Sequence, residues 1–473
     1  MPLLWAWRPL TRPRDAALVG LCFGLAYYGV ALGWSRHLGW AAWLGLVPLN
    51  AVCFVLVGAF LAPFTKRGVR SPWLIAALWV VFEGLRNRWV FGGMPWAEAG
   101  LALHDLPWGR ALATWGGIPL VSFVIVAVNG WLLELVEAVV THRRTLVPLG
   151  SLAAVVLVVV AASVFRPDPA VTGHIRYALL QGDDQDRELT VEEQVAGYQT
   201  EQHFALAERL RGRYDLVVFP ESALERDPER DPALRARLVD LAARLDATVL
   251  VNARTAAPDG GLYNANLAYD PDGTLQGQYA KRHLVPFGEY VPYRKWLDWI
   301  SAFSALDRVS FDYTAGDDRT VFRAGGHPFE TVICYESAYP ELTRQAARDG
   351  AELLVVTTSN RSFGRSGLSA QHVALGQMRA AETGRPVLHA AISGISAVID
   401  ADGRVVRHTG LFEREIVEGR LATTSGTTPF VRFGDWVVAG CLLGIVGTAV
   451  YAQRRWVRSE RAGSEGPPVA PVD

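Results

Sequence analysis

Long apolar segments dominate both ends of the chain, whereas the middle is far more polar. About 20 helical residues are needed to cross the hydrocarbon core of a bilayer. Apolar segments of about that length lie at 16–34, 38–64, 71–93, 118–140, 146–165 and 435–453. The pattern predicts six membrane spans. The third is the least regular, because Glu83 and Arg86 near its end are costly at membrane depth.

Arginine and lysine residues gather in alternate loops between these spans. The groups are Arg8, Arg12 and Arg14; Lys66, Arg67 and Arg70; Arg143 and Arg144; and Arg454, Arg455, Arg458 and Arg461. Short cytoplasmic loops carry this excess of positive charge. We therefore expect residues 166–434 on the extracytoplasmic side and the C-terminal tail in the cytoplasm. A cleaved signal peptide is not expected, since further spans follow the first.

The middle of the chain alternates short apolar runs with amphipathic stretches. Buried strands are predicted at 174–182, 215–221, 247–253, 329–336, 352–360 and 386–394, and helices at 190–213, 231–245, 339–349 and 369–384. Tyr269–Gly273 and Asp400–Gly403 are typical of hairpin turns. Repeated βαβ order predicts an α/β domain with covered sheets.

These patterns divide the chain into four parts. They are N-terminal transmembrane helices at 1–165, an extracytoplasmic domain at 166–429, a C-terminal transmembrane helix at 430–456 and a disordered cytoplasmic tail at 457–473.

Composition narrows the possible functions. A formal net charge of -1 gives no basic surplus for nucleic acid. Three of the four cysteines lie within predicted spans, which leaves Cys334 alone in the outer domain and excludes an internal disulfide there. No second cysteine or closely spaced histidine pair accompanies Cys334, so neither a metal site nor a cofactor is expected.

Three predicted strands end in polar residues. Glu221 closes one strand, Cys334 lies near the end of another, and Asn360 closes a third. The carboxyl ends of strands in an open α/β sheet face a common crevice. We therefore expect these side chains to lie close together.

Cys334, Lys281 and Glu221 together suggest acyl transfer. A cysteine at a strand-to-helix transition meets free backbone N–H groups that favour its thiolate. Lys281 lies in an aromatic, proline-rich loop and is the candidate cation, and Glu221 is the candidate base. Because an ordinary thiol is only a few per cent ionised near neutral pH, it needs such activation to attack an ester.

Each residue also has a simpler interpretation. Glu221 could cap a helix, Lys281 could be a solvated loop charge, and Cys334 could be an inert core cysteine. Glu289 and Glu336 could support the site or be ordinary surface carboxylates. The combination of these residues, rather than any one of them, favours a catalytic site.

Several long segments resemble the apolipoprotein N-acyltransferases, membrane members of the nitrilase, or carbon-nitrogen hydrolase, superfamily. The segments are VVFPESAL, YAKRHLVPFGEYVP, TVICYES, LWVVFEGLRNRWVFGGMPW and QHVALGQMRAAETGRPVLHAAISGISAVI. The resemblance implies a nitrilase-like αββα sandwich joined to an all-α transmembrane helix bundle. It implies a catalytic triad of Glu221, Lys281 and Cys334. Residues expected to support the site or bind substrate are Phe287, Glu289, Tyr335, Glu336, Asn360 and Phe363.

The same resemblance implies a reaction and a location. Such enzymes move an acyl chain from a phospholipid onto the cysteine, and then to the α-amine of an S-diacylglyceryl cysteine at a lipoprotein N-terminus. The expected partners are a phospholipid, a diacylated apolipoprotein and the bilayer, with no cofactor. The expected location is the bacterial inner membrane with the catalytic domain on the periplasmic side, and a monomer is expected.

Three features depart from the family pattern. The segment Ser359–Gly364 lacks the Asp and Trp that members usually carry, and residues 181–194 lack a tryptophan found in many of them. Six spans are predicted where the family typically has eight. The first two departures affect loops expected to contact lipid or acceptor.

Two other functions remain compatible with the sequence. One is a membrane-tethered amidase in which water resolves the acyl-enzyme. The other is a non-catalytic membrane protein that binds lipoproteins. Six spans favour a lipid substrate over a soluble amide, and the complete set of Glu221, Lys281 and Cys334 disfavours the non-catalytic alternative.

Overall fold

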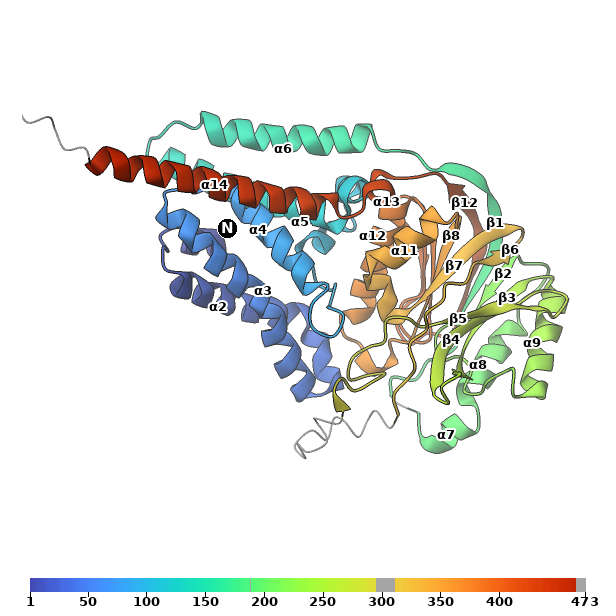
Figure 1. The fold of residues 1–473 in the computed structure, drawn as a ribbon. Helices are drawn as coiled ribbons and strands as arrows, with labels where there is room; N and C mark the ends of the chain where they lie inside the picture. The colour runs from blue at the N-terminus through green and yellow to red at the C-terminus, as the bar shows by residue number, and fades with distance from the viewer. Residues whose placement is uncertain (188, 295–310, 465–473) are drawn as a thin grey trace, which may run out of the picture.

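A helical bundle lies beside a two-sheet domain in the computed structural model, which describes residues 1–187, 189–294 and 311–464 (Figure 1). Helices occupy all six predicted span positions: α2 (Pro13–Ala31), α3 (Trp40–Lys66), α4 (Pro72–Arg86), α5 (Pro107–Val140), α6 (Leu146–Val164) and α14 (Trp436–Ser464). Within the described ranges, four helices, α3, α5, α6 and α14, are long and apolar enough to cross a membrane.

Two predicted spans differ from the observed helices. The third was predicted to reach residue 93 but ends at Arg86, because residues 87–98 form a loop that the buried Arg86 side chain helps to hold. The fourth begins earlier, at Pro107, and contains a kink at Gly116 and Gly117. The sequence 118–140 is therefore only the second part of α5.

The predicted disorder of residues 457–473 is wrong for its first part. Helix α14 continues to Ser464, since the alanine, arginine and glutamate residues of this stretch are compatible with a helix. Residues 465–473 lie outside the described part of the chain.

Two six-stranded sheets form the centre of the polar domain. The first has the order β12-β1-β2-β3-β4-β5 and the second the order β11-β10-β9-β8-β7-β6. The strands are β1 (Ala170–Gln181), β2 (Leu216–Val218), β3 (Thr248–Ala256), β4 (Leu262–Tyr269), β5 (Leu275–Ala280), β6 (Phe322–Ala324), β7 (His327–Ile333), β8 (Leu353–Thr358), β9 (Val387–Ala391), β10 (Ala397–Ile399), β11 (Val405–His408) and β12 (Glu415–Ser425). Strands β1, β2 and β3 run parallel, as do β7, β8 and β9, and antiparallel strands flank each trio.

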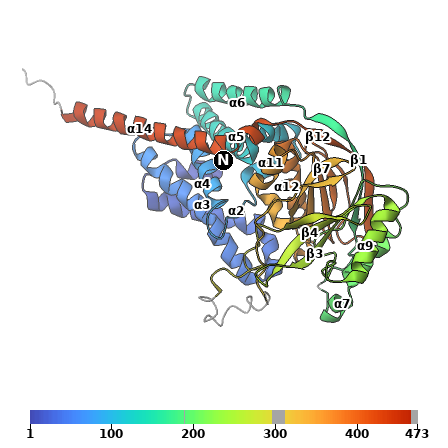
Figure 2. The ribbon, with the colours of Figure 1, turned by 45° about the vertical axis from the view of Figure 1, so that its right-hand side comes forward.

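Helices cover the outer faces of both sheets. Helices α7 (Val191–Val195), α8 (Tyr198–Ala207) and α9 (Pro232–Leu245) belong to the first half, and α11 (Pro340–Arg348), α12 (Leu368–Thr383) and α13 (Pro429–Phe433) to the second. One apolar core lies between the sheets, another under α8 and α9, and a third extends from the second sheet through α11 and α12 into the membrane bundle. Figure 2 shows α11 and α12 between the sheets and the bundle, where α12 packs on α5. The predicted αββα sandwich joined to a helical bundle is confirmed.

Smaller differences have local causes. The helix predicted at 190–213 is broken at Gly197, which adopts a left-handed conformation. The strand predicted at 329–336 ends at Ile333, and Cys334 instead begins the short helix η4 (Cys334–Ala338). Both predicted turns are confirmed, since Asp270–Gly273 joins β4 to β5 and Asp400–Gly403 joins β10 to β11.

Candidate active site

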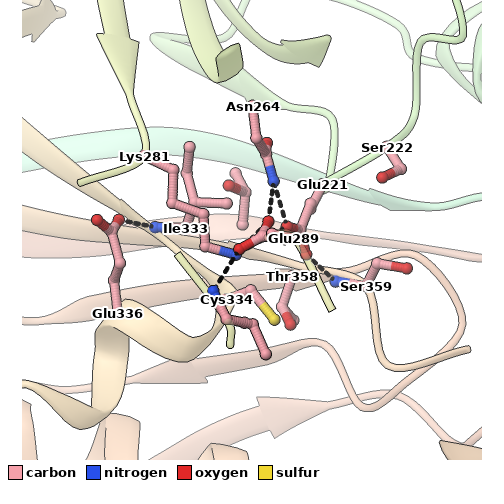
Figure 3. Close-up of polar contacts among 12 residues, drawn as sticks. Glu221, Ser222, Asn264, Lys281, Glu289, Ile333, Cys334, Glu336, Thr358 and Ser359 are labelled. Atoms are coloured by element: carbon pink, nitrogen blue, oxygen red, sulfur yellow. Dashed lines mark hydrogen bonds and ion pairs between the residues drawn. The ribbon is translucent and has the colours of Figure 1, made fainter. Parts of the chain in front are cut away.

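Strand ends bring Glu221, Lys281 and Cys334 together. Lys281 directly follows β5, Cys334 directly follows β7, and Glu221 lies three residues after β2. Figure 3 shows the three side chains gathered between the two sheets. The structure thus brings Glu221 and Cys334 together as their strand ends predicted, and it places the candidate cation Lys281 beside them.

Lys281 is enclosed by two carboxylates. Its Nζ lies 2.9 Å from Oε1 of Glu289 and 3.4 Å from Oε1 of Glu221. Nδ2 of Asn264 donates to the same two oxygens, at 3.0 Å and 2.8 Å. The Lys281 side chain is only 1% exposed, so its charge is balanced inside the protein rather than by water.

Backbone groups fix the two carboxylates. The N–H of Ser359 donates to Oε2 of Glu221 at 2.7 Å, and the N–H of Val285 donates to Oε2 of Glu289 at 2.8 Å. Glu221 is therefore not the helix cap considered as its simpler interpretation, since its oxygens accept from Ser359, Asn264 and Lys281.

Cys334 sits in a strained turn supported by Glu336. Its φ of 53° is unusual for a residue other than glycine. The buried carboxylate of Glu336 accepts from the backbone N–H groups of Ile333, Arg282 and His283 at 2.7–3.0 Å. Glu336 thus joins the turn that carries Cys334 to the segment that follows Lys281, and it is not an ordinary surface carboxylate.

Opposing electrostatic effects act on the thiol. Burial and then the Glu221 carboxylate raise the pKa of the Cys334 thiol to about 12, against the effects of Lys281 and a hydrogen bond from Thr358. Burial would lower the pKa of Lys281, but Glu289 and Glu221 outweigh it and raise this pKa well above its usual value. At neutral pH the resting site therefore holds a neutral thiol beside an ammonium group.

Within the described ranges no three His, Cys, Asp or Glu side chains are grouped as metal ligands.

The membrane loop 87–98 contacts the segment that carries Cys334. The Tyr335 hydroxyl donates to the carbonyl oxygen of Gly93 at 3.0 Å, and that of Tyr339 does so at 3.2 Å. The Trp96 ring stacks on Tyr335, with centroids 6.3 Å apart. Since Nη1 of Arg86 donates to the carbonyl oxygen of Trp96 at 2.8 Å, helix α4 is linked through this loop to the candidate nucleophile.

Aromatic residues predicted to contact substrate lie where the two domains meet. Phe287 is 48% exposed and meets the ring of Phe91 from the membrane loop, with centroids 5.8 Å apart. Phe363 packs edge-on against Trp34 at 5.2 Å.

The altered segment Ser359–Gly364 is anchored by an ion pair that the sequence did not reveal. Nε of Arg361 donates to the buried Asp183 carboxylate at 2.6 Å. Asn360 in the same segment is buried, and the hydrogen-bond partners of its side chain among the described residues are Thr358 and His372.

Asn264 is the main residue that sequence analysis missed. Its Oδ1 accepts from Asn252 at 2.9 Å, while its Nδ2 bridges Glu221 and Glu289. Neighbouring Asn266 donates to Thr331 and Thr357 on the second sheet. Asparagines at alternate positions of the otherwise apolar segment LYNANLAY were the available signal, because buried amides require partners.

Gly93→Ala is expected to reduce turnover, although residue 93 does not contact Glu221, Lys281 or the Cys334 sulfur. Gly93 has a φ of 85°, and an added Cβ would lie 2.1 Å from the carbonyl oxygen of Asn87. Positive φ alone costs about 1–3 kcal/mol, and the clash must also displace the carbonyl that binds Tyr335. We expect turnover to fall by about tenfold or more.

Gly92→Ala is the matched control for that change. Gly92 also has a positive φ, but an added Cβ would meet nothing nearer than 4.0 Å. Steady-state rates and melting temperatures of both variants test the prediction. Equal losses in the two would show that backbone strain, not the position of the Gly93 carbonyl, is responsible.

Comparisons with known proteins match both halves of the chain. The carbon-nitrogen hydrolase family matches residues 186–428, and the apolipoprotein N-acyltransferase N-terminal domain matches residues 1–131. The apolipoprotein N-acyltransferase of Methylococcus capsulatus is 32% identical, over 96% of this chain and 91% of its own. That of Geobacter metallireducens is 30% identical, with the same coverage. A solved structure of a carbon-nitrogen hydrolase superfamily protein from Xanthomonas campestris is 22% identical, with a TM-score of 0.41 over 52% of this chain and 90% of that one. With matching domains at both ends and relatives of this identity along nearly its whole length, the chain belongs to the apolipoprotein N-acyltransferase family.

Proposed function

We propose that this chain transfers an acyl group from a phospholipid, through a thioester on Cys334, to the α-amine of an S-diacylglyceryl cysteine at a lipoprotein N-terminus. The observation that carries the proposal is the position of Cys334. Its sulfur lies beside Glu221 and Lys281, and the next residue, Tyr335, is hydrogen-bonded to the membrane loop at Gly93. The printed names of the relatives support the same activity.

In the first half-reaction, the Cys334 sulfur attacks the ester carbonyl carbon. Glu221 takes the thiol proton and passes it to the departing glycerol oxygen as the carbon–oxygen bond breaks. The Lys281 ammonium, together with backbone N–H groups at the start of η4, stabilises the oxyanion. One such donor commonly contributes about 3–4 kcal/mol.

In the second half-reaction, the neutral lipoprotein amine attacks the thioester. Glu221 takes a proton from the amine, the carbon–sulfur bond breaks, and the sulfur regains a proton as the amide leaves. One carboxylate can thus serve as base in both steps. The products are a lysophospholipid and an N-acylated lipoprotein, and no cofactor is consumed.

The loop charges support a proposed location for the domain. We assign the arginine-rich loops to the cytoplasm, which places residues 166–429 on the periplasmic side of a bacterial inner membrane. In this arrangement residues 1–165 and 430–456 form the membrane part, and a single chain contains the whole site. Exposed Phe287 and Phe91 would then flank the route by which an acyl chain reaches Cys334.

A two-step labelling experiment tests the proposal. Membranes containing the full chain, incubated with acyl-labelled phospholipid, should acquire a hydroxylamine-sensitive label that is absent in Cys334→Ala and Cys334→Ser. Adding a diacylated lipopeptide should move the label to that peptide. Discharge to water alone would support the amidase alternative, and the absence of any Cys334-dependent label would support the non-catalytic one.

A further inference from the structure

A second group of polar residues, from β8 and α12, contacts Cys334. The side chain of Thr358 lies beside the Cys334 sulfur (Figure 3), and its hydroxyl is one of the groups that lower the pKa of this thiol. Nε2 of His372 lies 3.0 Å from the carbonyl oxygen of Cys334 and 2.8 Å from Oγ of Ser337. Thr358, His372 and Asn360 are all buried. None of them has a role in the mechanism above.

The contacts of His372 define its tautomer. A carbonyl oxygen only accepts, so Nε2 must carry the hydrogen that binds the oxygen of Cys334. Burial lowers the pKa of His372 to about 4, so the ring is neutral at physiological pH. Nδ1 is therefore an acceptor, and it needs a donor.

Asn360 can supply that donor. Its Oδ1 lies 3.2 Å from Nδ1 of His372 and, with the amide in this orientation, accepts from the Thr358 hydroxyl at 3.2 Å; that hydroxyl also lies 3.3 Å from Nδ1 of His372. The buried Nδ2 of Asn360 has no partner among the described residues. Two acceptors cannot bond each other, and amide oxygen and nitrogen are assigned from their partners. Turning the amide by 180° directs its two hydrogens at His372 and Thr358. Neither Asn360 nor Nδ1 of His372 then needs the hydroxyl hydrogen of Thr358, which is left for the sulfur.

We propose that Thr358 is a further catalytic residue, whose hydroxyl donates to the Cys334 sulfur as negative charge develops there, and that Asn360 and His372 are positioning residues for that hydroxyl and for the Cys334 backbone. The catalytic role of Thr358 rests on the proposed function, which it deepens. The Cys334 carbonyl belongs to the residue with φ 53°, so the bond from His372 helps to hold an unfavourable turn.

Alkylation of Cys334 by iodoacetamide tests the Thr358 contact without any acyl substrate. Peptide mapping by mass spectrometry separates Cys334 from the other cysteines of the full chain in detergent. Removing a donor to a thiolate raises the thiol pKa, so Thr358→Val should shift the alkylation profile to higher pH. The rate at a fixed pH below the pKa should fall on the order of tenfold or more. Thr358→Ser keeps the hydroxyl and should restore the rate.

Variants of His372 test the positioning role. His372→Leu should lower both the Cys334 alkylation rate and kcat, with little change in KM, whereas His372→Gln, which can donate to the carbonyl, should recover part of each. Unchanged alkylation in Thr358→Val, with an unchanged melting temperature, would overturn the inference, as would a His372→Leu variant that loses only thermal stability. If the wild-type chain alkylates as expected but transfers no acyl group, the proposed function fails while the Thr358 contact stands.

Discussion

Glu221→Gln should slow acylation of Cys334 by about 10²–10⁴-fold, the usual contribution of a positioned general base. Glutamine has nearly the same shape but cannot take the thiol proton. The same change should make the thiol more acidic, because the Glu221 carboxylate is one of the groups that raise the pKa of Cys334 to about 12. Acylation and thiol ionisation are therefore expected to move in opposite directions.

Two measurements on the same protein separate these effects. Single-turnover acylation from labelled phospholipid reports the base, and iodoacetamide alkylation at several pH values reports the thiol. Glu225→Gln is a suitable control, because Glu225 is a carboxylate on the same loop that accepts from the backbone of Gln199 and Thr200. If acylation and alkylation of Glu221→Gln fell together, Glu221 would be acting as a structural support and not as a base.

The meeting of Glu221 and Cys334 could be anticipated because the ends of their strands are visible in the sequence. Both follow parallel strands, whose carboxyl ends meet at one edge of a sheet. Lys281 instead follows β5, an antiparallel strand that was not predicted, so its position beside them could not be derived in this way. The role of Asn264 could not be read in the same way. Its partners depend on which strand lies beside which, and the sequence of β4 does not contain that information.

Contacts between the two domains could not be predicted from the sequence either. Arg86 was interpreted only as a costly charge near the end of a span, whereas it holds the loop whose Gly93 carbonyl binds Tyr335. Likewise, the sequence showed only that the segment around Arg361 departs from the family pattern, whereas in the structure Arg361 binds the buried carboxylate of Asp183. Charged residues in unusual sequence positions could be recognised, but their partners lie far away along the chain.

Lys281→Met should abolish most acyl transfer and also weaken the fold. Loss of one oxyanion donor commonly costs about 10²–10³-fold in rate. It also leaves Glu221 and Glu289 close together, sharing Nδ2 of Asn264, with no cation between them. Removing one partner from a buried ion pair typically costs about 3–5 kcal/mol of stability.

The stability loss should depend on pH in a defined direction. Two neighbouring carboxylates without a counter-charge favour binding of a proton by one of them. The folded Lys281→Met protein then holds a proton that the unfolded chain releases, so its stability is greater at low pH and falls as the pH rises. Its melting temperature should therefore lie closer to that of the wild type at pH 5 than at pH 8.

The double variant Lys281→Met with Glu289→Gln separates folding from chemistry. Neutralising Glu289 removes the second carboxylate, so the double variant should regain much of the melting temperature at pH 8. It should not regain acyl transfer, because no ammonium is left to stabilise the oxyanion. Recovery of activity along with stability would mean that Lys281 serves only to neutralise Glu221 and Glu289. Recovery of neither would point to a packing role for the Lys281 side chain, which is 1% exposed in the wild type.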